Sequence, residues 1–278
     1  PELFERLYQK SNYAQRREEI DAYNAQSLID YRGLSVVPVK FGISFTARFL
    51  NQGNALVNVH TDGTVQVATG GTEMGQGLNA KIRDVAASCF GIPANDVIVT
   101  ATSTEKNHNT SPTAASSGSD INCAAAEQAC LKIVDRLKNI AVQVFERQAP
   151  LTPSEEFCLD ETLDTSSILL KNEWVFNAKN TNQRIAFAEL VRTCFFNRIS
   201  LGEYGYHKTE GIYFDVEKGF GHPFLYYTNG ICCSEVSIDR YTGELKVLQS
   251  DIIMDLGRTI NEGIDYGQVC GAFVQGMG

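Results

Sequence analysis

The sequence predicts an α+β fold in which β-hairpins form layers with single helices. Residues 55–68 alternate between apolar and polar side chains on both sides of a Thr-Asp-Gly turn, which is typical of a hairpin. Residues 223–252 carry the strongest strand pattern of the chain, again as two runs around a turn. Residues 77–90 and 120–146 instead place apolar side chains on one helical face. Strand pairs interleaved with single helices favour α+β layers over a doubly wound sheet.

Weaker patterns predict the remaining elements. We expect a helix over 1–24, a strand–turn–strand unit over 35–49, a short strand over 97–100, a strand that turns into a helix over 185–196, and a glycine-spaced helix over 264–277. No internal repeat or low-complexity tract is visible in the sequence.

The chain is expected to divide into three parts. Residues 1–147 form a first lobe that holds the glycine-rich and Thr-Ala-Ala-Ser segments, and residues 201–278 form a second lobe that is truncated at its C-terminal end. Residues 148–200 lack a clear period over most of their length and are interpreted as a linker or a variable surface excursion. With 278 residues, 43% of them hydrophobic, the chain can bury one large core or two smaller ones.

Charge and cysteine spacing exclude several classes of protein. The formal net charge of −9 argues against a nucleic-acid or anionic-membrane partner, because both require a positive surface. The eight cysteines contain no C-x-x-C pair, and with the four histidines they lack the spacing of zinc or iron–sulfur sites. We therefore expect free thiols in a reduced cytoplasm. The sequence has no apolar run long enough for a membrane helix and no basic–apolar signal peptide.

A glycine-rich segment, residues 70–77, lies between a predicted strand and a predicted helix. Its four glycines allow a tight turn and close backbone approach to a ligand, and the helix that follows directs N–H groups at the loop. Gln76 adds an amide suited to the edge of a heterocycle. A simple strand–helix connection is the alternative. A dinucleotide site is another alternative, because residues 75–80 fit G-x-G-x-x-A, but Asp96 precedes its strand where a ribose-binding acid should end one.

Two further segments have features of an anion site. Residues 109–119 crowd small and hydroxyl side chains ahead of the long helix, for which Ser119 or Asp120 is the expected N-cap; an ordinary capped loop is the alternative. Gln268 follows a glycine near the start of the last predicted helix, where a solvated glutamine is the default interpretation.

Together these segments resemble the molybdenum-binding part of the xanthine dehydrogenase and aldehyde oxidase family. The resemblance rests on five strings in the family's order: KFGISFT (40–46), GGTEMGQGLNAKI (70–82), NTSPTAASSGSD (109–120), NGICCSEVSIDRYTGEL (229–245) and DYGQVCGAFVQGMG (265–278). It covers nearly the whole chain and is weakest over 148–200. VTATSTEK (99–106) followed by TAASSGSD is most similar to the separate molybdenum subunit of bacterial xanthine dehydrogenases.

The resemblance implies a cofactor and a reaction. In this family a molybdenum pyranopterin (molybdopterin) receives no direct metal ligand from the protein, and it hydroxylates purines, hypoxanthine and xanthine to urate, with water. Electrons leave through 2Fe-2S clusters to FAD, which lie on other domains or subunits. An aldehyde oxidase or another N-heterocycle hydroxylase is the nearest alternative within the family. A dinucleotide-binding dehydrogenase is the alternative from outside it.

The resemblance also assigns roles to eight residues. Seven are expected to hold the cofactor: Met74, Gly75, Gln76, Ala115, Ser116, Ser117 and Gln268. Phe45, the second aromatic of FGISF, is expected to stack against the bound purine, although a core residue of a strand is the plainer interpretation.

Other parts of the family's machinery have no counterpart in these 278 residues. The family's general-base glutamate lies in a GEPP-like string downstream of GAFVQG, and its GGGFGG-like and RGFG-like strings lie upstream. We therefore expect no catalytic residue in this chain and negligible turnover by the isolated chain, since losing a general base alone costs about 10²–10⁴-fold. The family's NPAID appears as residues 261–265, NEGID, which lacks the proline ahead of the last helix.

Overall fold

The computed structural model describes residues 2–147 and 156–278, so residues 148–155 of the expected linker lie outside the described residues. The chain forms two compact units. Unit 1 comprises residues 1–43, 226–259 and 265–278, and unit 2 comprises residues 44–225 and 260–264. The expected α+β class is confirmed. The units do not coincide with the expected lobes 1–147 and 201–278, because strands from opposite ends of the chain pair within unit 1.

Unit 1 is a three-stranded antiparallel sheet with two helices on one face. The sheet order is β1-β11-β12, and its strands run over Asp30–Ile43, Tyr226–Asp239 and Leu245–Asp255. β1 pairs with β11 along its whole length, so the expected strand–turn–strand over 35–49 is wrong: one strand continues to Ile43. Pro38 is accommodated because β1 is an edge strand of this sheet.

The helices of unit 1 are α1 (Glu2–Lys10) and α2 (Tyr13–Gln26), where a single helix was expected. Asn12 interrupts them with a left-handed backbone (φ 50°), a conformation that asparagine tolerates better than most residues. Both helices pack on the sheet and bury an apolar cluster with it: Leu7, Ile20, Leu34, Ile231 and Cys233. α6 (Glu262–Met277) confirms the expected last helix, and most of it belongs to unit 1.

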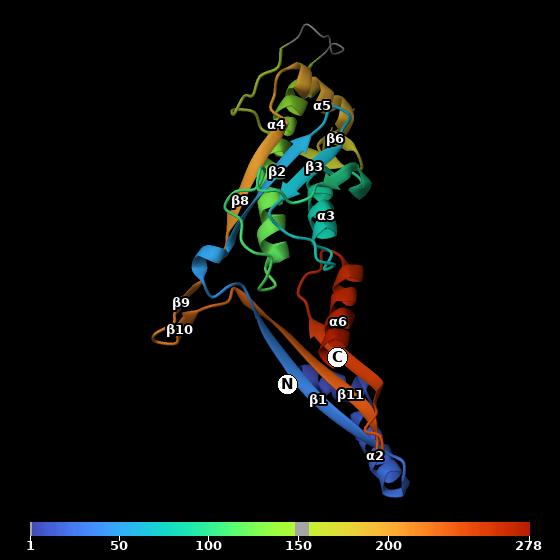
Figure 1. Ribbon diagram of the computed structural model, residues 1–278. Helices are drawn as coiled ribbons and strands as arrows, with labels where there is room; N and C mark the ends of the chain where they lie inside the picture. The colour runs from blue at the N-terminus through green and yellow to red at the C-terminus, as the bar shows by residue number, and fades with distance from the viewer. Residues whose placement is uncertain (1, 148–155) are drawn as a thin grey trace. The chain divides into compact units, whose positions relative to one another are not determined.

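Unit 2 is built on a four-stranded sheet covered by two helices (Figure 1). The sheet order is β4-β3-β2-β8, with bounds Val97–Val99, Val65–Thr69, Gln52–Val59 and Gly202–Lys208. β2 and β3 form the predicted hairpin, with Ala55 opposite Thr69 and Val59 opposite Val65. β4 runs parallel to β3, so the sheet is mixed and lacks the parallel, doubly wound arrangement that a dinucleotide site requires.

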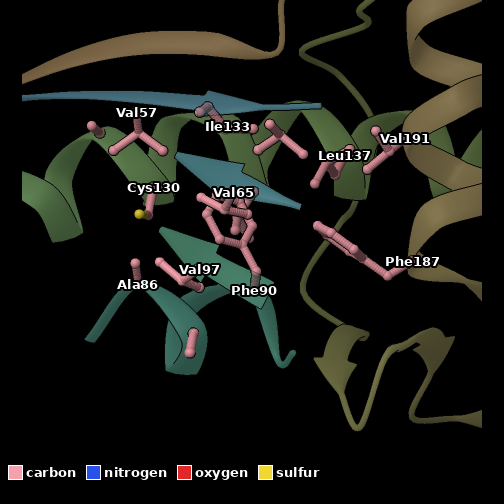
Figure 2. Packing of buried hydrophobic residues seen from close by; sticks show 14 of the residues in the cluster. Val57, Val65, Ala86, Phe90, Val97, Cys130, Ile133, Leu137, Phe187 and Val191 are labelled. Carbon is pink, nitrogen blue, oxygen red and sulfur yellow. The ribbon is translucent and has the colours of Figure 1, made fainter. Parts of the chain in front are cut away.

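The helices on this sheet are α3 (Leu78–Phe90) and α4 (Gly118–Glu146), which confirm both helical predictions. They pack against each other, and Figure 2 shows core residues that they share with the strands. Fully buried side chains such as Ile82, Phe90, Ile133 and Leu137 fill this core.

The segment expected to be irregular contains a second sheet. β5, β6 and β7 form antiparallel hairpins over Ile168–Lys171, Trp174–Asn177 and Asn180–Ala186. α5 (Phe187–Phe196) follows directly, as the strand-to-helix pattern predicted. Unit 2 also holds a two-stranded ribbon, β9 (Tyr213–Asp215) with β10 (Phe220–His222), and two 3₁₀ turns, η1 (Arg48–Leu50) and η2 (Ala94–Asp96).

None of the helices formed by residues 2–147 and 156–278 is both long enough and apolar enough to cross a lipid bilayer.

Candidate functional site

The glycine-rich loop between β3 and α3 requires glycine at specific positions. Gly75 and Gly77 adopt positive φ angles of 99° and 76°, which L-residues rarely reach. A Cβ atom at Gly70 would lie 1.8 Å from the Thr110 hydroxyl oxygen. The loop ahead of α4, residues 109–117, can therefore approach only because Gly70 has no side chain. A Cβ atom at Gly77 would lie 2.8 Å from the side chain of Ile264. These glycines therefore allow the tight turn that the sequence predicted, and Gly70 and Gly77 also allow the side chains of Thr110 and Ile264 to approach closely.

Glu73 occupies the N-terminus of α3, where we expected N–H groups available to a ligand. Its carboxylate accepts backbone hydrogen bonds from Gly75, Gly77 and Asn79, each at 2.9 Å. Partial burial opposes the charge of this carboxyl, but the N–H groups of Asn79, Gly77 and Gly75 outweigh burial and lower the pKa of Glu73 below its usual range. The positive end of α3 is thus neutralised by the protein's own carboxylate.

The amide of Gln76 stabilises the same loop from inside. Its Oε1 accepts a hydrogen bond from the Met74 N–H at 2.5 Å, and its Nε2 donates to the Thr72 carbonyl at 2.8 Å. The side chain of Met74 is 66% exposed. Apart from Gly75 and its two chain neighbours, no residue has a heavy atom within 4 Å of the position that a Cβ at Gly75 would occupy. Met74 and Gly75 therefore border open space, whereas Gln76 is partly buried.

The second loop reaches α4 through two strained residues. Ala115 and Ser116 have φ angles of 56° and 54°, and adjacent left-handed residues without glycine cost energy. Ser117, not Ser119 or Asp120, is the N-cap of α4, and its hydroxyl donates to the Ala114 carbonyl at 3.1 Å. The Ser117 side chain makes no capping hydrogen bond with the first turn of α4. The start of α4 thus differs from the start of α3, where the Glu73 carboxylate accepts backbone hydrogen bonds.

Hydrogen bonds bring the two loops together. The Thr72 N–H donates to the Thr113 hydroxyl at 2.8 Å. The Thr102 hydroxyl donates to the Gly71 carbonyl at 2.7 Å, which ties the chain after β4 to the same loop. The glycine-rich loop and the loop ahead of α4 are therefore one connected surface of unit 2.

Phe45 joins this surface through its neighbour and is held by a buried asparagine. The Ser44 N–H donates to the Ala115 carbonyl at 3.3 Å. Asn51, only 2% exposed, accepts from the Phe45 N–H at 2.9 Å and donates to the Phe45 carbonyl at 2.8 Å. Phe45 itself is half-buried. Asn51 therefore fixes the backbone of a predicted substrate-contacting residue.

With this geometry described, comparison with known proteins identifies the family. The family described as "Molybdopterin cofactor-binding domain" matches residues 6–278. The chain belongs to this family. The glycine-rich loop before α3 and the loop before α4 both lie in unit 2 of this domain.

Relatives of this molybdopterin-binding domain include several xanthine dehydrogenases. It is 41% identical to xanthine dehydrogenase 1 of Arabidopsis thaliana, 40% to xanthine dehydrogenase of Dictyostelium discoideum and 39% to xanthine dehydrogenase/oxidase of Rattus norvegicus. These alignments cover 99–100% of the chain but only 18% of each relative. The domain thus spans less than a fifth of the length of the relatives that it matches.

Solved structures share the fold of the domain at lower identity. Quinoline 2-oxidoreductase from Pseudomonas putida 86 aligns with a TM-score of 0.78 and 22% identity over 97% of this chain and 32% of that chain. Aldehyde oxidoreductase from Desulfovibrio desulfuricans aligns with a TM-score of 0.68 and 20% identity over 99% of this chain and 25% of that chain. At these identities the comparison establishes the fold.

The eight predicted residues of the domain fall into two groups. Seven lie in unit 2, in the two loops and the Ser44–Phe45 segment: Phe45, Met74, Gly75, Gln76, Ala115, Ser116 and Ser117. Ser117 is buried. Gln268 lies exposed on α6, in unit 1. Glu262 stands at the position of the family's proline, and the preceding Asn261 fixes this helix start: its Oδ1 accepts from the Ile264 N–H at 3.2 Å and its Nδ2 donates to Asp84 at 3.0 Å.

Two residues of the candidate site were missed from the sequence. Glu73 carried a recognisable signal, since an acid just ahead of a predicted helix is a common capping residue. Asn51 carried a weaker one, an asparagine in a turn. Among the described residues, no group of three His, Cys, Asp or Glu side chains is placed to hold a metal ion.

Proposed function

We propose that this chain supplies the pterin-binding loops and one wall of the substrate pocket of a molybdenum hydroxylase that converts hypoxanthine and xanthine to urate with water. The observation that carries the proposal is the Thr72–Thr113 hydrogen bond, which joins the two loops on one surface. Identities of 39–41% to xanthine dehydrogenases over nearly the whole chain support a purine rather than an aldehyde as substrate.

The donor set fits an anionic pterin at one helix start and not at the other. At α3 the Glu73 carboxylate already accepts the backbone N–H bonds, and it would repel a second anion. At α4 the Ser117 side chain makes no capping hydrogen bond, which supports a phosphate-like group at this helix start; Asp120 is the acidic residue of its first turn. We infer that the charged part of the cofactor lies against residues 115–117, whereas Gln76 and Gly75 meet its neutral heterocycle.

The residues of this chain contribute by positioning the cofactor and the substrate. A bound molybdenum pterin supplies the two-electron oxidation chemistry. Asn51 fixes the backbone of Phe45 by hydrogen bonds to both its N–H and its carbonyl. The aromatic ring of Phe45 is therefore positioned before a planar purine binds. Ala115 and Ser116 store backbone strain that ligand contacts can offset, which is a frequent feature of binding loops.

Further components are required for turnover. We infer that iron–sulfur and FAD modules, and a general-base glutamate, come from polypeptide beyond these 278 residues, since the chain corresponds to 18% of its relatives. We also infer a cytoplasmic location, which the eight free cysteines support. Gln268, on unit 1, is proposed as a further amide partner of the pterin.

The test uses the complete enzyme that contains this chain. We expect xanthine-dependent NAD reduction and bound molybdenum, and we expect Gln76→Ala to lower the molybdenum content per protein because the loop loses both amide hydrogen bonds. Gln128→Ala, at an exposed position on α4, serves as the matched control. Unchanged molybdenum in Gln76→Ala would remove this residue from the site. Activity with aldehydes and none with xanthine would refute the purine assignment.

A further inference from the structure

A pocket opens in unit 2 where β2 begins and β8 ends. Its volume is about 400 Å³, within the range of about 300–1,000 Å³ that is typical of small-molecule sites. The residues that line it come from η1 and the start of β2 on one side, and from the end of β8 and the two residues after it on the other. They include Arg48, Phe49, Gln52, Tyr206, Lys208 and Glu210. The proposed function places no ligand in this pocket.

Strand register explains why three of these side chains share one face of the sheet. β2 and β8 lie side by side (Figure 1), and Lys208 is paired with Gln52. Tyr206 precedes Lys208 by two residues, so its side chain points to the same face. Gly205 points to the opposite face, where an added Cβ would lie 1.9 Å from the Ala125 carbonyl oxygen of α4. The pocket therefore lies on the face of the sheet opposite α4.

Hydrogen bonds hold the walls of the pocket in place. The Tyr206 hydroxyl donates to Gln52 Oε1 at 2.9 Å, and Gln52 Nε2 donates to the Phe49 carbonyl at 2.8 Å. The Thr209 N–H donates to the Asn51 carbonyl at 2.9 Å. These bonds connect η1, β2 and β8. A ligand therefore meets walls that are already ordered, which lowers the entropic cost of binding.

The pocket is positively charged although the chain carries a net charge of −9. Lys208 Nζ lies 3.0 Å from Glu210 Oε1. This hydrogen bond and the charge of Lys208 lower the pKa of Glu210, and the nearby guanidinium of Arg48 lowers it further. Among residues 2–147 and 156–278, Arg48 itself has no carboxylate within ion-pair distance. Two cations and one carboxylate leave one net positive charge, centred on Arg48.

Exposed aromatic rings stand beside this charge. Phe49 is 71% exposed and Tyr206 is 41% exposed. Such rings offer their faces to a planar ring, and the planar guanidinium of Arg48 can bond both oxygens of a carboxylate at once. One net positive charge matches a carboxylate better than a phosphate group, which carries about 1.5 to 2 negative charges at neutral pH. The chemistry of the walls therefore fits a carboxylate attached to an aromatic ring.

We propose that this pocket is a second ligand site of the domain, which binds a planar aromatic carboxylate with its charged end at Arg48 and its ring against Phe49 and Tyr206. The pocket adjoins the candidate functional site through two residues. The side chain of Asn51 bonds the backbone of Phe45, and the Gln52 carbonyl accepts from the Ser111 hydroxyl at 2.9 Å. A bound ligand therefore restrains residues next to both Phe45 and the loop ahead of α4.

The experiment titrates the full chain with 2-naphthoate in a calorimeter. 2-Naphthamide has the same rings without the charge and serves as the matched neutral probe. We expect 2-naphthoate to bind at least about tenfold more tightly, because hydrogen bonds between charged groups are stronger than those between neutral groups. Inorganic phosphate at the same concentration should not displace it. Equal affinity for the two probes, displacement by phosphate, or no binding of 2-naphthoate would overturn the proposal.

Variants at exposed positions locate the binding without disturbing the fold. Arg48→Gln removes the charge and should weaken binding of 2-naphthoate about tenfold. Phe49→Ala removes the exposed ring and should weaken binding of both probes. Arg192→Gln, at an exposed position on α5 outside the pocket, is the control and should bind both probes as the unaltered chain does. Unchanged affinity in Arg48→Gln, or an equal loss in Arg192→Gln, would contradict the assignment. The titration requires neither cofactor nor turnover, so its outcome is independent of the proposed function.

Discussion

The carboxylate of Glu73 can be tested directly as the cap of α3. Glu73→Ala removes an acceptor of three backbone hydrogen bonds, from Gly75, Gly77 and Asn79. Glu73→Gln keeps one carbonyl oxygen of similar shape but removes the charge. We expect both variants to loosen the glycine-rich loop and the first turn of α3, with Glu73→Ala the more severe.

The magnitude follows from the number of bonds and their exposure. Loss of a capping side chain costs about 0.5–2 kcal/mol, and the interaction of a charge with a helix end adds about 0.3–1 kcal/mol at exposed sites. Glu73 is exposed, so solvent screening keeps its contribution toward the low end of each range. We therefore expect about 1 kcal/mol for Glu73→Ala and about 0.5 kcal/mol for Glu73→Gln.

Amide hydrogen exchange is the suitable assay because it reports on single N–H groups. A loss of about 0.5 to 1 kcal/mol corresponds to a roughly 2- to 5-fold decrease in protection at Gly75, Gly77 and Asn79. The unaltered chain should show a matching pH dependence. Since the pKa of Glu73 is lowered in the folded state, the stabilisation is complete above its ordinary value of 4.5 and is lost as the pH falls through the lower folded value.

Glu161→Gln serves as the control, since this exposed glutamate lies in a loop outside the site. It should leave protection at the three amides unchanged. If Glu73→Ala gave the same protection as the unaltered chain, the backbone N–H bonds would not depend on the carboxylate, and the distinction drawn between the starts of α3 and α4 would fail.

Two further predictions concern the cores of the units. Leu137→Ala should destabilise unit 2 by about 2–5 kcal/mol in urea unfolding because Leu137 is 0% exposed, whereas Leu131→Ala, at a 47%-exposed position on the same helix, should change stability by less than about 0.5 kcal/mol. Arg16→Met should cost unit 1 about 3 kcal/mol, since it leaves Glu235 and Asp251 largely buried without the guanidinium that bonds them at 2.9 and 2.8 Å. Retained exchange protection in α1 and α2 of that variant would refute the estimate.

Local patterns predicted the local elements well. The β2–β3 hairpin, α3 and α4 were predicted because the alternation or helical spacing of their apolar residues is visible within short stretches of sequence. The strand-to-helix change that leads into α5 was visible for the same reason.

Nonlocal pairing accounts for most of the differences. β1 continues to Ile43 because it pairs with β11, from Asp30 opposite Asp239 to Ile43 opposite Tyr226. A local sequence pattern cannot predict a pairing partner so distant in the chain. The β5–β7 sheet was missed because its strands are short, and polar residues dominate Asn180–Gln183. The break between α1 and α2 depends on the single left-handed residue Asn12.

In the candidate site too, local features were predicted from the sequence and nonlocal contacts were not. Glycine positions were foreseen from their conformational freedom, and the loops before α3 and α4 do meet. The direction of polar side chains was not foreseen: Glu73 turns back onto α3, and Asn51 reaches the backbone of Phe45. Such choices depend on hydrogen-bond partners that become neighbours only in the folded chain.

The way unit 2 leaves and re-enters the rest of the chain has an evolutionary and practical consequence. Its long segment runs from Ser44 to Leu225, and the Leu225 N–H donates to the Ser44 hydroxyl at 3.4 Å, so the segment starts and stops at neighbouring points. A domain whose termini adjoin can be inserted, exchanged or circularly permuted with little disturbance to its host. Recombination could thus replace this cassette as a whole, while β1 and β11 on either side kept their pairing intact.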